Sequence, residues 1–140
     1  MFFDYFSIDL ARIKGMQTRF LCYAVPGQDY YKSTRKMVLQ GVDGIVFVAD
    51  SQSSRFNDNI AAMADIKALL HEHDYDFETI PFVLQLNKRD LPNISTVEEL
   101  NQALNHKNWP IQEAVALDGT GVTETFKIVC KQVVTKLNLQ

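Results

Sequence analysis

A short polar segment, Asn87-Lys88-Arg89-Asp90, directly follows an apolar run at residues 83–86. A short apolar run that ends in turn-forming residues is typical of a buried parallel strand. In an open α/β sheet, ligands bind just beyond the carboxyl ends of such strands. We therefore expect Asn87, Lys88 and Asp90 to be ligand-binding residues at this edge of the sheet.

The side chains of this segment fit the edge of a guanine base. The two acceptor oxygens of the Asp90 carboxylate match a neighbouring pair of N–H donors, which guanine carries on its ring N1 and exocyclic amine. Adenine has an acceptor at N1 and no amine beside it, so it would leave the carboxylate unpaired. The stem of Lys88 can lie along a base while its ammonium reaches loop carbonyls, and Asn87 can tie the loop to its neighbours. The alternative is an ordinary strand-to-turn junction with solvated charges.

The length and charge of the chain limit its function classes. Its 140 residues suit one domain with a real core. A net charge of −3 does not favour binding to nucleic acid or to an anionic membrane. Cys22 and Cys130 fall in a predicted strand and a predicted helix, which suits a reduced cytosolic protein. Since no apolar run approaches membrane-spanning length, we expect a cytoplasmic protein without membrane insertion.

Further strands must position the polar segment. Two-faced patterns at residues 2–10 and 17–25 predict an antiparallel hairpin. The hairpin ends in Val25-Pro26-Gly27-Gln28, where glycine lets the backbone come close to a ligand. The run at residues 44–50 predicts a central strand, and residues 113–117 predict a short last strand.

Helices are predicted between these strands. Residues 29–40 have only a weak helical pattern, whereas a clear apolar stripe comprises Phe56, Ile60, Met63, Ile66, Leu69 and Leu70. Either Ser95 with Glu98 or Thr96 with Glu99 fits a capping box, before a stripe of Val97, Leu100 and Leu104. The stripe of the closing helix is Val122, Phe126, Val129, Val133 and Leu137. This alternation predicts an α/β fold with a mainly parallel sheet and right-handed crossovers.

Three segments in fixed order resemble the Ras-like small GTPases: Val25–Gln28 after the hairpin, Asn87–Asp90 after a central strand, and Ala114–Leu117 before Gly121. The segments VPGQ, GVDGIVFVADSQ, NKRDLPN and ALNHKN are similar to the bacterial MglA family, the polarity and gliding-motility GTPases. The resemblance covers the whole chain. It implies a Ras-like G domain of the P-loop NTPase type, with three α/β/α layers, over residues 1–140.

The resemblance also implies roles for individual residues. The guanine-specificity motif is matched by Asn87, Lys88 and Asp90, and the backbone N–H of Ala116 would donate to the guanine carbonyl oxygen, with Val115 and Leu117 as neighbours. The amide of Gly27 would sense the γ-phosphate. Gln28 would be the catalytic residue that orients the attacking water. The implied ligands are GTP and GDP with Mg²⁺, although no metal ligand is assigned in this chain.

The chain departs from the family pattern in two places. Ala24 stands where most Ras-like proteins have an aspartate. A non-acidic residue at this position is also typical of MglA-like sequences. The Gly-x-x-x-x-Gly-Lys-[Ser/Thr] loop, its preceding strand and its following helix are absent from the sequence. The five or six charge-assisted hydrogen bonds of that loop are together worth about 8–12 kcal/mol. Nanomolar binding is about 12 kcal/mol in total, so we expect this chain to bind guanine nucleotide weakly or not at all.

The missing strand would lie between residues 17–25 and 44–50. Its absence predicts a gap of about 10 Å with unpaired backbone groups, unless the sheet closes up. We expect an N-terminally incomplete G domain whose upstream segment would restore the loop.

Two function classes follow from the resemblance. The first is a guanine-nucleotide switch that hydrolyses GTP, stimulated by a roadblock-type activating protein resembling MglB. The second is a nucleotide-free interaction module that uses the hairpin and the following helix. A flavodoxin-like or response-regulator domain shares the architecture but leaves Asn-Lys-x-Asp and Pro-Gly-Gln unexplained.

The remaining polar and aromatic residues that could suggest a site are assigned structural or solvent-exposed roles. His71 and His73 are two positions apart, so on a helix they point in different directions and do not predict a metal pair. Trp109 is expected to anchor a loop beside the last strand. Asp50, at the end of a central strand, has no visible catalytic partner and is expected to cap or support the turn. Arg19 and Arg35 are expected on solvated faces.

Overall fold

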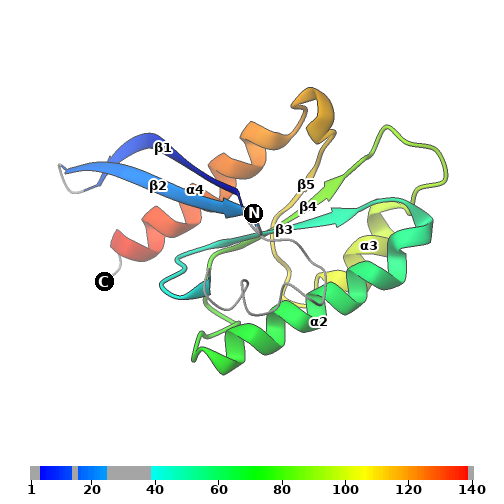
Figure 1. Ribbon diagram of the computed structural model, residues 1–140, viewed down its shortest axis with the longest axis horizontal. Helices are drawn as coiled ribbons and strands as arrows, with labels where there is room; N and C mark the ends of the chain where they lie inside the picture. The colour runs from blue at the N-terminus through cyan, green and yellow to red at the C-terminus, as the bar shows by residue number, and fades with distance from the viewer. Residues whose placement is uncertain (1–3, 14–15, 25–38, 139–140) are drawn as a thin grey trace.

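The computed structural model describes residues 4–13, 16–24 and 39–138, the first two ranges as backbone only (Figure 1). The segment 25–28 and most of the weak helical pattern at 29–40, including Arg35, lie outside the described residues. So does the side chain of Arg19, whose backbone belongs to a strand.

The N-terminal part is the predicted hairpin. Strand β1 (Asp4–Ile13) pairs antiparallel with β2 (Met16–Ala24). The register shifts between Asp9 and Ala11, which is a β-bulge. Because a bulge accommodates one extra residue, the ladder continues beyond it and β1 ends at Ile13, not at residue 10 as the sequence predicts.

A three-stranded parallel sheet forms the centre of the fold. Its order is β3 (Ile45–Asp50), β4 (Phe82–Asn87) and β5 (Ile111–Glu113). Strand β4 is buried along its whole length except at Asn87. A continuous apolar run with helices on both faces explains this burial. The α/β class and the parallel sheet are therefore confirmed.

Helices cover both faces of this sheet (Figure 1). Helices α2 (Phe56–Glu72) and α3 (Val97–Leu104) cover one face, and α4 (Val122–Asn138) covers the other. Side chains alternate along β4, so that Phe82, Leu84 and Leu86 pack towards α2 and α3 while Val83 packs towards α4. Short 3₁₀ turns precede α2 (Ser53–Arg55) and α4 (Ala116–Asp118).

The capping box before α3 uses the second of the two predicted pairs. Thr96 Oγ1 accepts from the Glu99 N–H, and Glu99 Oε2 accepts from the Thr96 N–H, both at 3.1 Å. The Ser95 N–H instead donates to the Ser51 carbonyl at 2.8 Å. Ser95 is therefore held against the end of β3, and the helix begins one residue later.

Two predictions near the C-terminus are wrong. The last strand occupies Ile111–Glu113 and not residues 113–117, because the chain leaves the sheet after the Ala114 N–H donates to the Leu86 carbonyl. On α4, Val122 and Leu137 are exposed, whereas Thr125 and Cys130 are buried with Val129 and Val133. Val122 and Leu137 lie at the two ends of the helix, and the middle of the helix packs on the strands.

Trp109 anchors the loop before β5, as predicted. Its ring stacks on Phe82 at a centroid distance of 4.0 Å and meets Phe77 edge-on at 5.2 Å. The Asn105 amide holds its backbone, because Oδ1 accepts from the Trp109 N–H and Nδ2 donates to the Trp109 carbonyl.

The hairpin and the parallel sheet are separate. Within the described residues, β2 forms no ladder with β3, so this part of the sheet does not close up. Across the same residues, no helix combines the length and apolar character needed to span a membrane.

Candidate functional site

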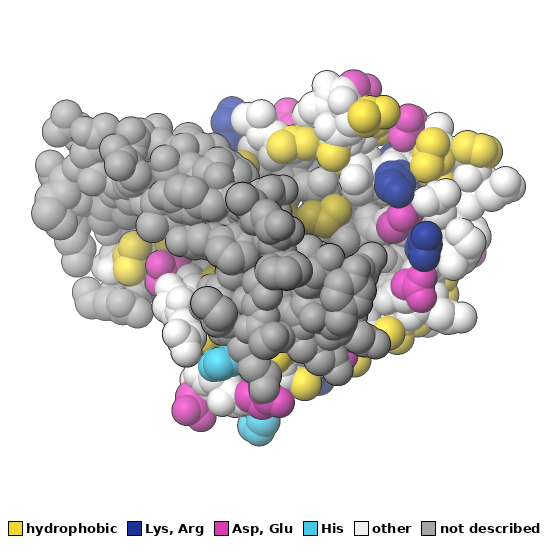
Figure 2. All heavy atoms as spheres, viewed as in Figure 1, with side chains coloured by type: hydrophobic (Ala, Val, Ile, Leu, Met, Phe, Trp, Pro, Cys, Tyr) yellow, Lys and Arg dark blue, Asp and Glu magenta, His cyan; other side chains and the backbone are white. Residues whose placement is uncertain are grey.

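Polar side chains gather where the three parallel strands end. Asp50 is the last residue of β3, Asn87 is the last residue of β4, and Ala114 follows β5. Figure 2 shows positively and negatively charged side chains next to one another at the end of the molecule to which β3 and β4 point. The carboxyl edge of the sheet is thus the polar edge that the sequence predicts.

A hydrogen bond between Asn87 and Ala116 joins the loops that follow β4 and β5. The Ala116 N–H donates to Asn87 Oδ1 at 2.8 Å, which agrees with the expectation that Asn87 ties loops together. The same N–H is the group that the family resemblance assigns to the guanine carbonyl oxygen. A bound guanine would therefore have to share this N–H or displace the Asn87 amide.

Lys88 adopts a left-handed backbone conformation, with φ of 64°. Its Nζ lies 3.0 Å from Asp50 Oδ2. The sequence predicts that this ammonium reaches loop carbonyls, whereas the structure gives it a carboxylate at the end of the neighbouring strand. The side chain thus bridges the ends of β4 and β3.

Asp50 has the supporting role expected for it. Its Oδ1 accepts from the Gln52 backbone N–H at 3.1 Å, and the Gln52 side-chain amide donates to both carboxylate oxygens. Burial raises the pKa of Asp50, but the hydrogen bonds from Gln52 and the contact with Lys88 outweigh it and hold this pKa below its usual value. Asp50 is therefore an anionic cap of the turn after β3 and a partner of Lys88.

Arg89 is a residue of this edge that the sequence does not reveal. Its Nη1 donates to the Ser95 carbonyl at 2.7 Å and its Nε donates to Glu113 Oε1 at 3.1 Å. Its own N–H donates to the Ala114 carbonyl. Arg89 thus ties the loop after β4 to β5 and to the start of α3. Since Glu113 lies 24 positions further along the chain, no local sequence pattern indicates this contact.

Asp90 and Leu117 face solvent beside these contacts. The carboxylate of Asp90 is exposed and takes no hydrogen bond from a residue that the structure describes, so both of its oxygens remain available to a ligand. The Leu117 side chain is 99% exposed. A single exposed leucine is ordinary on a protein surface, and this one lies next to the polar edge.

The loop after β5 needs glycine to turn back into α4. Gly121 has φ of 80°, and a Cβ there would lie 2.2 Å from the Glu113 carbonyl oxygen. The turn is closed by the Val115 N–H, which donates to the Thr120 carbonyl at 2.9 Å. The side-chain and backbone hydrogen bonds from Thr120 hold the pKa of Asp118 below its usual value. Val115, Ala116 and Leu117 are thereby presented at the edge.

The structure brings together most of the predicted site. Asn87, Lys88 and Asp90 lie on one loop, and Val115, Ala116 and Leu117 lie on the next, joined to the first by Asn87. Gly27 and Gln28 lie outside the described residues. Among the residues with described side chains, no three His, Cys, Asp or Glu residues form a group that could hold a metal ion.

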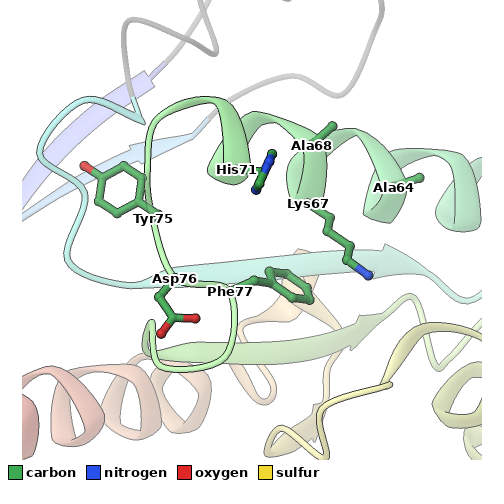
Figure 3. A pocket seen from close by; sticks show the side chains of 7 residues that line it. All are labelled: Ala64, Lys67, Ala68, His71, Tyr75, Asp76 and Phe77. Atoms are coloured by element: carbon green, nitrogen blue, oxygen red, sulfur yellow. The ribbon is translucent and has the colours of Figure 1, made fainter.

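A separate hollow lies between α2 and the loop that follows it (Figure 3). Its volume is about 510 Å³, and its lining is Ala64, Lys67, Ala68, His71, Tyr75, Asp76 and Phe77. Lys67 Nζ sits 5.5 Å from the centre of the Phe77 ring. Because α2 runs antiparallel to the strands, its C-terminal half lies towards the amino ends of the sheet, away from the polar edge. The hollow is therefore distinct from the candidate site.

Comparison with known proteins agrees with this geometry. The model of the ADP-ribosylation factor (Arf) family matches residues 6–133. The mutual gliding-motility protein MglA of Myxococcus xanthus (strain DK1622) is 50% identical over 137 residues, which cover 98% of this chain and 70% of the relative.

Proposed function

This chain belongs to the MglA family of small GTPases, which are GTP-binding switches, and we propose that its polar edge binds the guanine base of GTP and GDP. The observation that carries the proposal is the Asn87–Ala116 hydrogen bond. It holds the loop that carries Asp90 next to the loop that carries Leu117, so that one flat ligand can contact both.

In this proposal, each group at the edge makes one kind of contact with the base. The exposed Asp90 carboxylate accepts from the ring N1–H and the exocyclic amine of guanine. Leu117 covers one face of the base, next to Val115 and Ala116, and the stem of Lys88 lies against the other face. The Ala116 N–H donates to the guanine carbonyl oxygen and to Asn87 Oδ1, so that the two acceptors share this one donor.

Hydrolysis would depend on residues of the second motif. By resemblance, the Gly27 amide contacts the γ-phosphate and Gln28 orients the attacking water. Since water positioning matters only on the way to the transition state, Gln28 would contribute to turnover and little to nucleotide affinity.

We place the biological role in cell polarity or gliding motility, within the cytoplasm. This part of the proposal rests on the name of the relative, a mutual gliding-motility protein that is 50% identical to this chain. A roadblock-type activating protein resembling MglB is the proposed partner.

We expect the 140-residue chain alone to bind weakly, because its sequence contains no Gly-x-x-x-x-Gly-Lys motif for the phosphates. A base site without phosphate contacts is best tested with a nucleoside monophosphate. The experiment is a titration of the ¹⁵N-labelled chain with GMP and, separately, with AMP, followed by amide chemical shifts. GMP should shift the amides of Asp90 and Ala116 at millimolar concentration, and AMP should not.

The matched variant is Asp90→Asn. An amide can accept only one of the two guanine donors, so GMP binding should weaken, while xanthosine monophosphate, which carries a carbonyl in place of the amine, should bind better. An unchanged preference for GMP would remove Asp90 from the base site. Equal shifts with GMP and AMP in the parent chain would overturn guanine recognition and favour the nucleotide-free interaction module.

A further inference from the structure

We propose that Asp50 is a positioning residue for base recognition: its carboxylate fixes the Lys88 ammonium, so that the Lys88 stem is held across the ends of β3 and β4 against the bound base. This inference rests on the proposed function. Asp50 does not touch the base in this arrangement and acts only through Lys88, whose Nζ lies 3.0 Å from Asp50 Oδ2.

The first observation is the backbone of Lys88. A φ of 64° is uncommon for a residue other than glycine, asparagine or aspartate, because the Cβ meets the following carbonyl oxygen. Asparagine and aspartate can offset this strain with local hydrogen bonds of their short side chains, but lysine has no acceptor to do so. The ion pair with Asp50 supplies an attraction that favours the strained conformation at this position.

The second observation is that Asp50 is a fixed acceptor. The Gln52 side-chain amide donates to its two carboxylate oxygens at 3.1 and 3.2 Å, and the Gln52 backbone N–H donates to Oδ1 at 3.1 Å. A lysine paired with a mobile carboxylate would keep most of its freedom. A lysine paired with a carboxylate that is already oriented loses rotamers before the ligand arrives, which lowers the entropy cost of binding.

The third observation is that the backbones on both sides are held independently of this pair. The Asp50 N–H donates to Asn59 Oδ1 at 3.1 Å, and Asn59 Nδ2 donates to the Asp50 carbonyl at 2.8 Å. The Ser51 N–H donates to the Asn87 carbonyl at 3.1 Å. Loss of the Asp50 charge should therefore free the Lys88 side chain while the ends of β3 and β4 stay in place.

The test is a double-mutant cycle on the 140-residue chain, with GMP affinity measured by the same amide titration. The variants are Asp50→Asn, Lys88→Met and both together. An exposed ion pair has a modest energy, so Asp50→Asn should weaken GMP binding about threefold to fivefold. In the Lys88→Met background, Asp50→Asn should cause no further loss, because its effect passes through Lys88.

The matched control is Glu78→Gln. Glu78 lies in the loop before β4 and pairs with Lys107 in the loop before β5. The substitution therefore removes a carboxylate from an ion pair at the other end of the sheet. GMP affinity should not change in this variant. The spectra of all variants report whether the fold is kept.

The outcomes separate the inference from the function on which it rests. If the parent chain prefers GMP over AMP but Asp50→Asn binds GMP equally well, the positioning role is wrong and the function stands. An equal loss from Asp50→Asn in both backgrounds also overturns the inference, since it would show a role in the turn alone. If the parent chain does not prefer GMP, the proposed function fails and the inference fails with it.

Discussion

Val48 and Gln85 are partners in the ladder between β3 and β4, yet their environments are reversed. The apolar Val48 is 53% exposed, whereas the polar Gln85 is 6% exposed. Both side chains belong to the face that carries α4, which packs on the Val83 and Val46 side chains. Helix α4 therefore covers β4 along its length and leaves the carboxyl end of β3 open within the described residues.

This difference divides the molecule into two regions. The loops after β4 and β5 are held by side-chain hydrogen bonds that a few residues supply, mainly Asn87 and Arg89. The side of β3 away from β4 receives no strand from the part of the chain that the structure describes. The loop after β4 is nevertheless held on both sides, by β5 and by the end of β3, where Lys88 pairs with Asp50 and the Ser51 N–H donates to the Asn87 carbonyl.

The largest effect is expected in amide hydrogen exchange, which compares the paired parallel sheet with the hairpin that, within the described residues, forms no ladder with β3. A hairpin of two strands is marginally stable by itself, whereas β4 is paired on both sides and buried. We expect the amides of Leu84 and Leu86 to exchange at least about a thousandfold more slowly than the paired amides of β1 and β2. Equal protection in the two regions would show that the hairpin and the parallel sheet open as one unit.

The next largest effect, on the free energy of unfolding, should come from Gly121→Ala in the loop between β5 and α4. A Cβ 2.2 Å from the Glu113 carbonyl oxygen forces the chain to move. We expect the free energy of unfolding to fall by about 3 kcal/mol, measured by urea denaturation followed by circular dichroism.

Gly119→Ala is the control for that substitution. Gly119 also has a positive φ, of 87°, but a Cβ there would meet nothing within 4 Å. Gly119→Ala should lower the free energy of unfolding only by the cost of a positive φ at a residue with a Cβ, about 1 kcal/mol. If both variants lose the same stability, the close approach to Glu113 is not what requires glycine at position 121.

A smaller effect is expected for Arg89→Met, which removes one tie between the loops. The variant leaves the Ser95 carbonyl without its 2.7 Å donor, so the free energy of unfolding should fall by about 1–2 kcal/mol. The control is Arg55→Met, since Arg55 pairs with Asp58 in an exposed position. That variant should change stability by less than about 0.5 kcal/mol. Equal losses in the two variants would contradict the tying role of Arg89.

The smallest expected effect is the pH dependence of stability that comes from Asp50. The pKa of Asp50 is lowered in the folded state, so its stabilisation is complete above the pKa of an unfolded aspartate, about 4. It is lost as the pH falls below that value towards the folded pKa. The unfolding free energies of the parent chain and Asp50→Asn should differ by a few tenths of a kcal/mol at pH 6 and converge towards pH 3. A difference that grows in acid would have the wrong sign.

The predicted features that the structure confirms are those with local signals. The apolar runs that became β3 and β4, the helix α2 and the capping box of Thr96 are all legible within a few neighbouring residues. One residue of the predicted α2 stripe is wrong, because Ile60 is exposed and the neighbouring Asn59 is buried, where its side chain holds the backbone of Asp50. The exact position of β5 cannot be predicted in this way, because its three residues are fixed by pairing with β4 and not by their own pattern.

The site shows the same division. The motif residues Asn87, Lys88 and Asp90 could be named from their type and their position after an apolar run. The contacts that hold these residues could not be predicted. Lys88 pairs with a carboxylate 38 positions away, and Asn87 accepts a hydrogen bond from a backbone amide 29 positions away. Pairings over such separations depend on which strands become neighbours, and residue spacing carries no information about that.

The stacking of Trp109 on Phe82 gives the protein an internal optical reporter. Trp109 is the only tryptophan in the sequence and is 9% exposed, so its fluorescence emission should lie at short wavelength in the folded state and shift to the red on unfolding. The indole packs at the amino end of β4, a strand length away from Asn87 at the other end. Emission from this residue therefore measures the integrity of the core beneath α2 and α3, at the end of the sheet opposite to the polar edge.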